Sequence, residues 1–240
     1  MNPSSSNTST QDVLLSCQEA YNQMNTLLST QKLIRNYHCR INITSNANQY
    51  TIQTPLFPKE VLQVYSSYNL EDDIKDNDKE KYFSSHRGGS QGDYRFGMKD
   101  KIQNVVECLF LFPSSKRAVI TIPNNPRHCH KNDDDSKCMR EIHFYLNENS
   151  NNNNDDDDNT TITTTKRLDA TVWMRAQAAE IFPKNIHFIA CLMNRVADEL
   201  NSMIMEKSND DGGGSKGNRV HVQVGELFYL ATSLVSVRED

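Results

Sequence analysis

Apolar residues recur at helical spacing along the first part of the chain. From Gln11 to about Arg40 they fall every three or four residues, and this period predicts an amphipathic helix or a pair of helices. The segment from Arg40 to Gln53 then alternates apolar and polar residues around a turn-like tetrapeptide at Ser45, which predicts a hairpin of two short strands. Residues 1–10 are rich in Ser, Thr and Asn and are expected to be disordered.

A short helix and a polar loop are expected next. Pro58 is a typical first residue of a helix, and apolar residues follow it at helical spacing. The segment from Glu71 to Gly92 is dominated by charged residues, Ser and Gly, which predicts a long solvated loop. We therefore expect residues 11–91 to form a helical and hairpin part of the domain that ends in this loop.

The pattern then changes to that of a sheet. Met98 to Leu109 places its apolar residues on one face, which predicts a helix that packs on the core. Lys116–Pro123, Met139–Leu146 and Leu168–Met174 are compact apolar or alternating segments that predict strands. Asn147–Thr165 contains runs of Asn, Asp and Thr with too little apolar area to offset the entropy of ordering, so a disordered insertion is expected there.

The last part of the chain has the strongest helical pattern. Asn185–Met205 carries apolar residues at alternating three- and four-residue steps, so one side of this helix should be buried. A flexible connector at Asn209–Gly217 precedes strand-like residues from Val220 to Val237, which are broken near Gly225. These elements predict an α/β or α+β fold in which one mixed β-sheet packs against helices.

Chain length and net charge indicate how many domains to expect and which partners to exclude. With 240 residues, the chain is long enough for one substantial domain. The patterns divide it into a disordered start (1–10), a helical and hairpin part (11–91) and a core (92–240) with a disordered insertion at about 148–165. The net charge of -5 argues against a general nucleic-acid-binding protein, which needs a net basic surface.

Membrane and secretion features are not found in the sequence. No apolar run approaches the length of a membrane span, and the first residues lack the basic and apolar parts of a signal peptide. The six cysteines are scattered without the dense spacing of a disulfide framework, so we expect reduced thiols. A soluble, cytoplasmic protein with no membrane partner is the expectation.

One group of residues has the composition of a metal site. It consists of His128, Cys129, His130, Cys138 and His143. Histidine and thiolate ligands suit zinc, but the spacing fits no standard finger or ribbon. Three adjacent side chains also cannot readily reach one ion. We therefore expect no metal site.

The C-terminal two-thirds of the chain carries a collinear series of short motifs. They are Lys116-Arg117, Asn125-Pro126-Arg127, Cys138, His143-Phe144-Tyr145, Leu168 to Arg175, Pro183-Lys184-Asn185, Gly225-Glu226-Leu227 and Ser233 to Val237. In this order they resemble the motifs of the thymidylate synthase and dCMP hydroxymethylase superfamily. The resemblance covers about residues 92–240 and implies a mixed β-sheet packed against helices.

The resemblance implies a covalent reaction on a pyrimidine nucleotide. The thiolate of Cys138 would attack C6 of dUMP or dCMP, so that C5 becomes an enolate-like carbon that accepts a one-carbon unit. The implied activity is that of a methyltransferase or hydroxymethyltransferase of nucleotide biosynthesis. The implied donor is a reduced folate, methylenetetrahydrofolate, and the implied assembly is a homodimer.

The resemblance also assigns residues that hold the nucleotide. Arg175 would bind the phosphate, together with Lys116 and Arg117 that reach from a partner subunit. Their positive charge would favour the thiolate form of the nucleophile. Asn185 would contact the pyrimidine, and His143 stands where the family has glutamine.

Several positions depart from the family pattern. Arg175 is followed by Ala176 and Ala178 instead of serine and aspartate, while Val235 and Val237 replace histidine and tyrosine. Each loss removes hydrogen bonds worth about 0.5–1.5 kcal/mol. The alternative hypothesis is therefore a catalytically inactive family member that acts as a dimeric binding, regulatory or structural protein.

Each candidate residue also has an ordinary structural explanation. A free cysteine such as Cys138 often behaves as a small buried hydrophobe. A basic pair such as Lys116 and Arg117 is usually solvated, and Arg175 could extend to solvent from the end of a strand. Asn185 could cap the helix that follows it.

Overall fold

The computed structural model describes residues 13–82, 92–123, 137–148, 163–210 and 219–236. The strands are β1 (Leu14–Leu15), β2 (Leu33–Asn42), β3 (Val119–Thr121), β4 (Met139–Glu148), β5 (Thr163–Met174), β6 (Gln177–Ala178) and β7 (Arg219–Val235). The helices are α1 (Cys17–Leu28), α2 (Ala47–Tyr50), α3 (Lys59–Asn69), α4 (Asp76–Tyr82), α5 (Met98–Leu111), the 3-10 helix η3 (Ala179–Ile181) and α6 (Phe182–Asp210).

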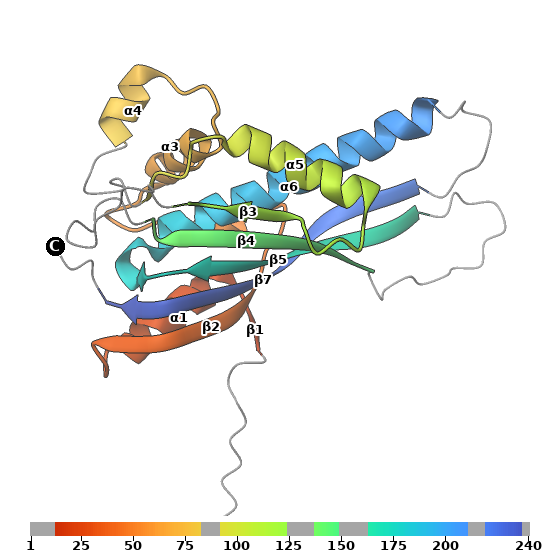
Figure 1. Cartoon of the computed structure of the whole chain (residues 1–240). Helices are drawn as coiled ribbons and strands as arrows, with labels where there is room; N and C mark the ends of the chain where they lie inside the picture. The colour runs from red at the N-terminus through yellow and green to blue at the C-terminus, as the bar shows by residue number, and fades with distance from the viewer. Residues whose placement is uncertain (1–12, 83–91, 124–136, 149–162, 211–218, 237–240) are drawn as a thin grey trace, which may run out of the picture.

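One seven-stranded mixed sheet forms the centre of the fold. Its strand order is β1-β2-β7-β5-β4-β3, and β6 pairs with the end of β7. Strands β5 and β7 are parallel, whereas β7 is antiparallel to β2 and β5 is antiparallel to β4. Helices α3, α5 and α6 lie along one side of this sheet (Figure 1). The chain therefore has the mixed α/β fold that the sequence patterns predict.

Helix α6 is the main element that packs on the sheet. Its first turn begins at Phe182, three residues before the predicted start, because Pro183 fits the first turn of a helix, where its missing N–H is not needed. Ile186, Ile189 and Met193 are buried, as the helical period of their positions predicts, and the opposite position Phe188 is buried as well. Most buried hydrophobic residues from α1 to β7 belong to one cluster, so the N-terminal part and the remainder share one core. A second, smaller cluster consists of Phe57, Val61 and Leu62.

Two parts of the N-terminal prediction differ from the structure. The predicted helix ends at Leu28, and residues from Leu33 onwards form β2, which pairs with β7 along nine residue pairs. The predicted hairpin is wrong, because β2 is one strand and α2 follows it. The side chain of Asn46 accepts a hydrogen bond from the N–H of Asn48 at 3.1 Å, so the turn-like sequence starts a helix.

Other boundaries also differ in detail. The predicted polar loop after Glu71 contains helix α4. The predicted strand Lys116–Pro123 is shorter, as β3. Thr163–Thr165, expected within the insertion, begin β5, and residues 149–162 lie outside the described residues, as do residues 1–10. Within the described part of the chain, no helix combines the length and apolar character needed to cross a membrane.

A bulge and a polar network interrupt the sheet where the sequence pattern is broken. Gly225 and Glu226 of β7 together lie opposite Asp169 of β5, so β7 continues through this point with one extra residue. A Cβ atom on Gly225 would lie 2.2 Å from Cγ of Arg167, so only glycine fits there. This close approach is the reason that the strand pattern breaks at Gly225.

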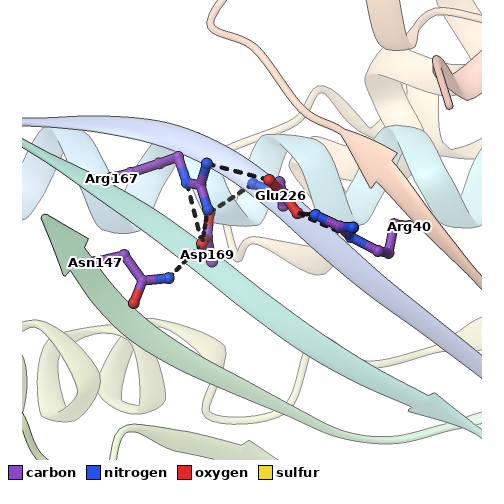
Figure 2. A network of polar contacts seen from close by, with 5 residues as sticks. All are labelled: Arg40, Asn147, Arg167, Asp169 and Glu226. Atoms are coloured by element: carbon purple, nitrogen blue, oxygen red, sulfur yellow. Dashed lines mark hydrogen bonds and ion pairs between the residues drawn. The ribbon is translucent and has the colours of Figure 1, made fainter. Parts of the chain in front are cut away.

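The polar network lies beside the bulge, on the side of the sheet away from α6 (Figure 2). Asp169 accepts hydrogen bonds from Arg167 at 2.8 Å, from Asn147 at 2.6 Å and from the N–H of Glu226 at 2.6 Å. Glu226 forms ion pairs with Arg167 at 3.1 Å and with Arg40 at 2.5 Å. Strands β2, β7, β5 and β4 are thereby joined by charge-assisted hydrogen bonds.

Candidate functional site

Cys138 and Arg175 lie at the same end of two neighbouring strands. Cys138 directly precedes β4 and Arg175 directly follows β5, and these two strands are antiparallel neighbours. The backbone N–H of Arg175 donates a hydrogen bond to the carbonyl oxygen of Cys138 at 2.7 Å. Cys138 is only 7% exposed. This burial also fits an ordinary cysteine that packs as a small hydrophobic residue.

Three buried tyrosines lie near Cys138 at this end of the strands. The hydroxyl of Tyr94 accepts a hydrogen bond from the N–H of Met139, the residue after Cys138, at 3.2 Å. Burial raises the pKa of Tyr94 well above its ordinary value, and the nearby thiol of Cys138 raises it further. The pKa values of Tyr65 and Tyr229 are raised in the same way, mainly by burial and in part by Cys138. The three hydroxyls are therefore neutral and act as hydrogen-bonding groups.

Asn185 is joined to the same region through Gln177 and Tyr229. The Nδ2 atom of Asn185 donates to Oε1 of Gln177 at 2.8 Å, and the Tyr229 hydroxyl donates to the same oxygen. The Oδ1 atom of Asn185 is buried, and among the described residues it has no hydrogen-bond partner. An acceptor in this state carries an unfavourable desolvation cost until a donor reaches it.

A buried lysine completes the group. Lys184 is 3% exposed, and its Nζ lies 5.0 Å from the centre of the Tyr65 ring. We call this group the Cys138 cluster. Its residues are Tyr65, Tyr94, Cys138, Arg175, Gln177, Lys184, Asn185 and Tyr229. The motifs assign a role to three of them, Cys138, Arg175 and Asn185. Lys184 lies within a quoted motif but receives no role there, and the other four residues were not singled out from the sequence.

Three predicted site residues lie elsewhere in the chain. Lys116 and Arg117 are exposed just before β3, and the antiparallel register of β3 with β4 places them beyond His143, away from Cys138. His143 itself lies on the side of the sheet away from α6, since its neighbours Ile142 and Phe144 face the core. Within one chain, the structure places Cys138 beside Arg175 and links Asn185 to them through Gln177 and Tyr229, whereas the contribution expected from Lys116 and Arg117 is that of a partner subunit and stays a prediction.

The helix-capping explanation of Asn185 is wrong. Helix α6 begins at Phe182, so Asn185 is inside the first turn and its side chain bonds to Gln177. Val235 lies near the cluster, because β6 pairs with β7 and places Ala178 opposite Val235. Val237 lies outside the described residues.

A second polar group lines a cavity of about 280 Å³ between α2, α3 and α6. The Nδ1 atom of His187 lies 2.7 Å from the Ser66 hydroxyl and 3.7 Å from the thiol of Cys191. Burial lowers the pKa of His187 to about 4 and raises the pKa of Cys191. Both side chains are therefore neutral near pH 7, which excludes a thiolate–imidazolium nucleophile in this cavity.

The buried imidazole of His187 makes a testable contribution to acid sensitivity. Its pKa is about 4 in the folded chain and 6.5 in the unfolded chain, so stability that is present above pH 6.5 is lost as the pH falls towards 4. The loss should reach about 3 kcal/mol, since each pKa unit is worth about 1.4 kcal/mol. Urea unfolding between pH 7 and pH 4.5 measures it. In His187→Gln the dependence should flatten, and equal slopes for both proteins would contradict this account.

The histidine and cysteine group with the composition of a metal site lies only partly within the described residues. Among them, no three His, Cys, Asp or Glu side chains are grouped so that they could hold a metal ion. His128, Cys129 and His130 lie outside the described residues.

Comparisons with known proteins do not assign the chain to a family. No model of a known protein family matches the chain, and no curated protein is found to be similar to it. A functional hypothesis for this protein therefore depends on its motifs and on the geometry of the Cys138 cluster.

Proposed function

We propose that the Cys138 cluster binds a pyrimidine nucleoside monophosphate of the dUMP or dCMP class, and that Cys138 is the nucleophile of a C5 transfer reaction. The observation that carries this proposal is the buried acceptor of Asn185, which belongs to the same cluster as a cysteine and an arginine. These are the residues that the thymidylate synthase resemblance assigns to base, nucleophile and phosphate.

The base would satisfy the Asn185 acceptor. Uracil offers the N3–H group and cytosine offers the C4 amine, and either can donate to Oδ1. Gln177 fixes the orientation of the amide, because it accepts from Nδ2 and thereby directs Oδ1 away from itself. The network through Tyr229 holds Gln177 in turn. This preorganised acceptor supports recognition of a ring N–H or amine group.

The phosphate would lie near Arg175. A guanidinium group matches the oxygens of a phosphate and keeps its charge at all relevant pH values. Ala176 removes a hydroxyl that the family pattern places beside this arginine, so the phosphate contact is weaker unless Lys116 and Arg117 of a partner subunit contribute. Since Cys138 is 7% exposed, nucleotide binding requires neighbouring side chains to move.

The chemical step follows from these positions. The Cys138 thiol gives its proton to water, the sulfur forms a bond to C6, and the electron pair of the C5–C6 double bond moves to an enolate that extends over C5 and the C4 oxygen. The C5 carbon then takes a proton from water or accepts a one-carbon unit. Positive charge from Arg175 favours the thiolate form of the nucleophile.

The tyrosines of the Cys138 cluster do not offer an open face to a reduced folate. A pterin ring needs an open aromatic or apolar face, but Tyr65, Tyr94 and Tyr229 are each at most 3% exposed. Tyr94 stacks on Phe188, and Phe182 packs its ring edge-on against Tyr229. No step of the proposal is therefore derived through a folate, and the one-carbon donor stays unassigned. The proposal places the protein in the cytoplasm, where its thiols stay reduced.

Exchange of the C5 hydrogen tests the proposal without any donor. Reversible attack by Cys138 makes C5 basic, so dUMP incubated with the protein in D₂O should lose its C5–H proton NMR signal. The Cys138→Ala variant should show no exchange, whereas Cys191→Ala should behave as wild type because its thiol lies in the separate cavity. Absence of exchange in the wild type would reject the catalytic role, and equal exchange in Cys138→Ala would reject the nucleophile.

A second candidate function is that of a non-catalytic homodimer, which the sheet surface favours. On the side of the sheet away from α6, Trp173, Phe228 and Leu230 are 38–43% exposed on the adjacent strands β5 and β7. No helix of the described residues covers them. In the neighbouring network the carboxylates of Asp169 and Glu226 are buried and paired with Arg167 and Arg40 (Figure 2), so this apolar surface carries no uncompensated charge from the network that would oppose contact with a second copy.

Light scattering tests the dimer. The wild type should have twice the mass of the chain, and Trp173→Asp should be monomeric because a charge at the centre of an apolar interface is costly. Thr121→Asp, on the edge strand β3, is the control. A monomeric wild type at micromolar concentration would exclude this candidate.

A further inference from the structure

The cavity between α2, α3 and α6 is lined mainly by polar side chains. Its volume of about 280 Å³ leaves space for roughly nine water molecules at about 30 Å³ each. Helix α6 contributes a polar stripe to its wall, at helical spacing and on the side opposite to the apolar stripe. This polar stripe consists of His187, Cys191, Asn194, Arg195 and Asp198. The proposed nucleotide site uses none of these side chains.

The inner end of the cavity is uncharged. Ser66 and His187 are 3% and 4% exposed, and the Ser66 hydroxyl lies 2.7 Å from Nδ1 of His187. Tyr50 packs its ring edge-on against the imidazole. Burial lowers the pKa of His187 to about 4, so the imidazole is neutral near pH 7. This end therefore offers hydrogen bonds to an uncharged polar group, and it has no positive charge for an anion.

The outer part of the wall has more negative than positive charge. Arg195 is already paired with Asp72, because its Nη2 atom lies 3.0 Å and 3.3 Å from the two carboxylate oxygens. Asp198 is exposed, and within the described ranges its carboxylate has no ion-pair partner. One guanidinium group thus faces two carboxylates in this wall, and the charge of Asp198 is left uncompensated.

Asn194 presents a hydrogen-bond acceptor on the same side of α6. Its Nδ2 atom donates to the carbonyl oxygen of Ala190 at 2.8 Å and to that of Thr44 at 3.2 Å. Because both partners are acceptors, the amide nitrogen must face them, and only Oδ1 is left for a ligand. Asp198 lies one helical turn further along, so this oxygen and its carboxylate can approach one group.

We propose that this cavity is a binding site for a small organic amine, whose ammonium group lies between Asn194 and Asp198 and whose uncharged polar end lies near Ser66 and His187. An ammonium group has three donors and no acceptor, which matches an amide oxygen beside a carboxylate. The uncompensated charge attracts a cation and opposes an anion. The inference goes beyond the proposed function, since this cavity is separate from the Cys138 cluster.

The first test compares three probes of similar length on the full wild-type chain. They are 4-amino-1-butanol, the uncharged 1,4-butanediol and the anion 4-hydroxybutyrate. In an NMR titration, the aminobutanol should shift the backbone N–H signals of Cys191 and Asn194 and bind about tenfold more tightly than the diol. The anion should bind more weakly than the diol. An amine that binds no more tightly than the diol, or not at all at tens of millimolar, would overturn the inference, and this comparison needs no variant.

The second test removes the charge without changing the shape of the side chain. Asp198→Asn should weaken binding of 4-amino-1-butanol about fivefold and leave binding of 1,4-butanediol unchanged. Glu206→Gln makes the same change at an exposed position of α6 that does not line the cavity, so it should bind the amine as the wild type does. A folded Asp198→Asn protein with wild-type affinity for the amine would show that the ammonium group does not bind at this carboxylate.

Discussion

Replacing Asp169 with alanine should lower the free energy of unfolding by about 3 kcal/mol or more. The carboxylate of Asp169 is 1% exposed and accepts hydrogen bonds from Arg167, from Asn147 and from the backbone N–H of Glu226. The variant leaves that N–H buried without its acceptor and removes the anion that compensates Arg167. The effect is large because one side chain joins β4, β5 and β7 at the bulge.

One further variant separates the charge of Asp169 from its hydrogen bonds, and another is a surface control. Asp169→Asn keeps one oxygen that can accept from the N–H of Glu226 but removes the negative charge, so its loss should be smaller than that of Asp169→Ala. Glu141→Ala removes an exposed carboxylate from β4 and should change stability by about 0.5 kcal/mol or less. Chemical denaturation of the three variants measures these differences. Equal midpoints for Asp169→Ala and Glu141→Ala would show that the network does not stabilise the sheet.

The main elements follow from local pattern, because burial imposes a period on the sequence. The apolar stripe of α6 and the alternation in β4 identify a helix and a strand without any long-range information. Strand β2 was interpreted as a helix end and a hairpin because its partner, β7, lies almost two hundred residues later. Asn46 caps the start of α2 with its side chain. Residues that cap helices are also common in turns, so this segment has a turn-like composition.

The candidate site was predictable only in part. Cys138, Arg175 and Asn185 were found because their order resembles a known series of motifs, and the pairing of β4 with β5 brings the first two together. Tyr229 was missed, since a tyrosine within an apolar segment has no local pattern that distinguishes a site from the core. Lys184 received no role, because the resemblance assigns only Asn185 of the Pro183-Lys184-Asn185 motif. Their role depends on distances between segments that only the fold provides.

Affinity for a pyrimidine nucleotide depends most directly on two side chains of the cluster. Arg175→Met removes the cation proposed for the phosphate, and Asn185→Ala removes the buried acceptor proposed for the base. Each should weaken binding of dUMP by about tenfold or more, because charged and buried hydrogen bonds are worth about 1.5–3 kcal/mol and 1.4 kcal/mol is tenfold in affinity. Asn194→Ala is the matched control, since it removes the same amide from α6 on the wall of the separate cavity.

Calorimetric titration of the full chain with dUMP and dCMP is the measurement that tests the central claim. The account predicts that at least one nucleotide binds the wild type and the Asn194→Ala control, and that binding is weakened in both Arg175→Met and Asn185→Ala while all four proteins stay folded. Absence of binding of either nucleotide at millimolar concentration, or binding that neither cluster variant changes, would contradict it.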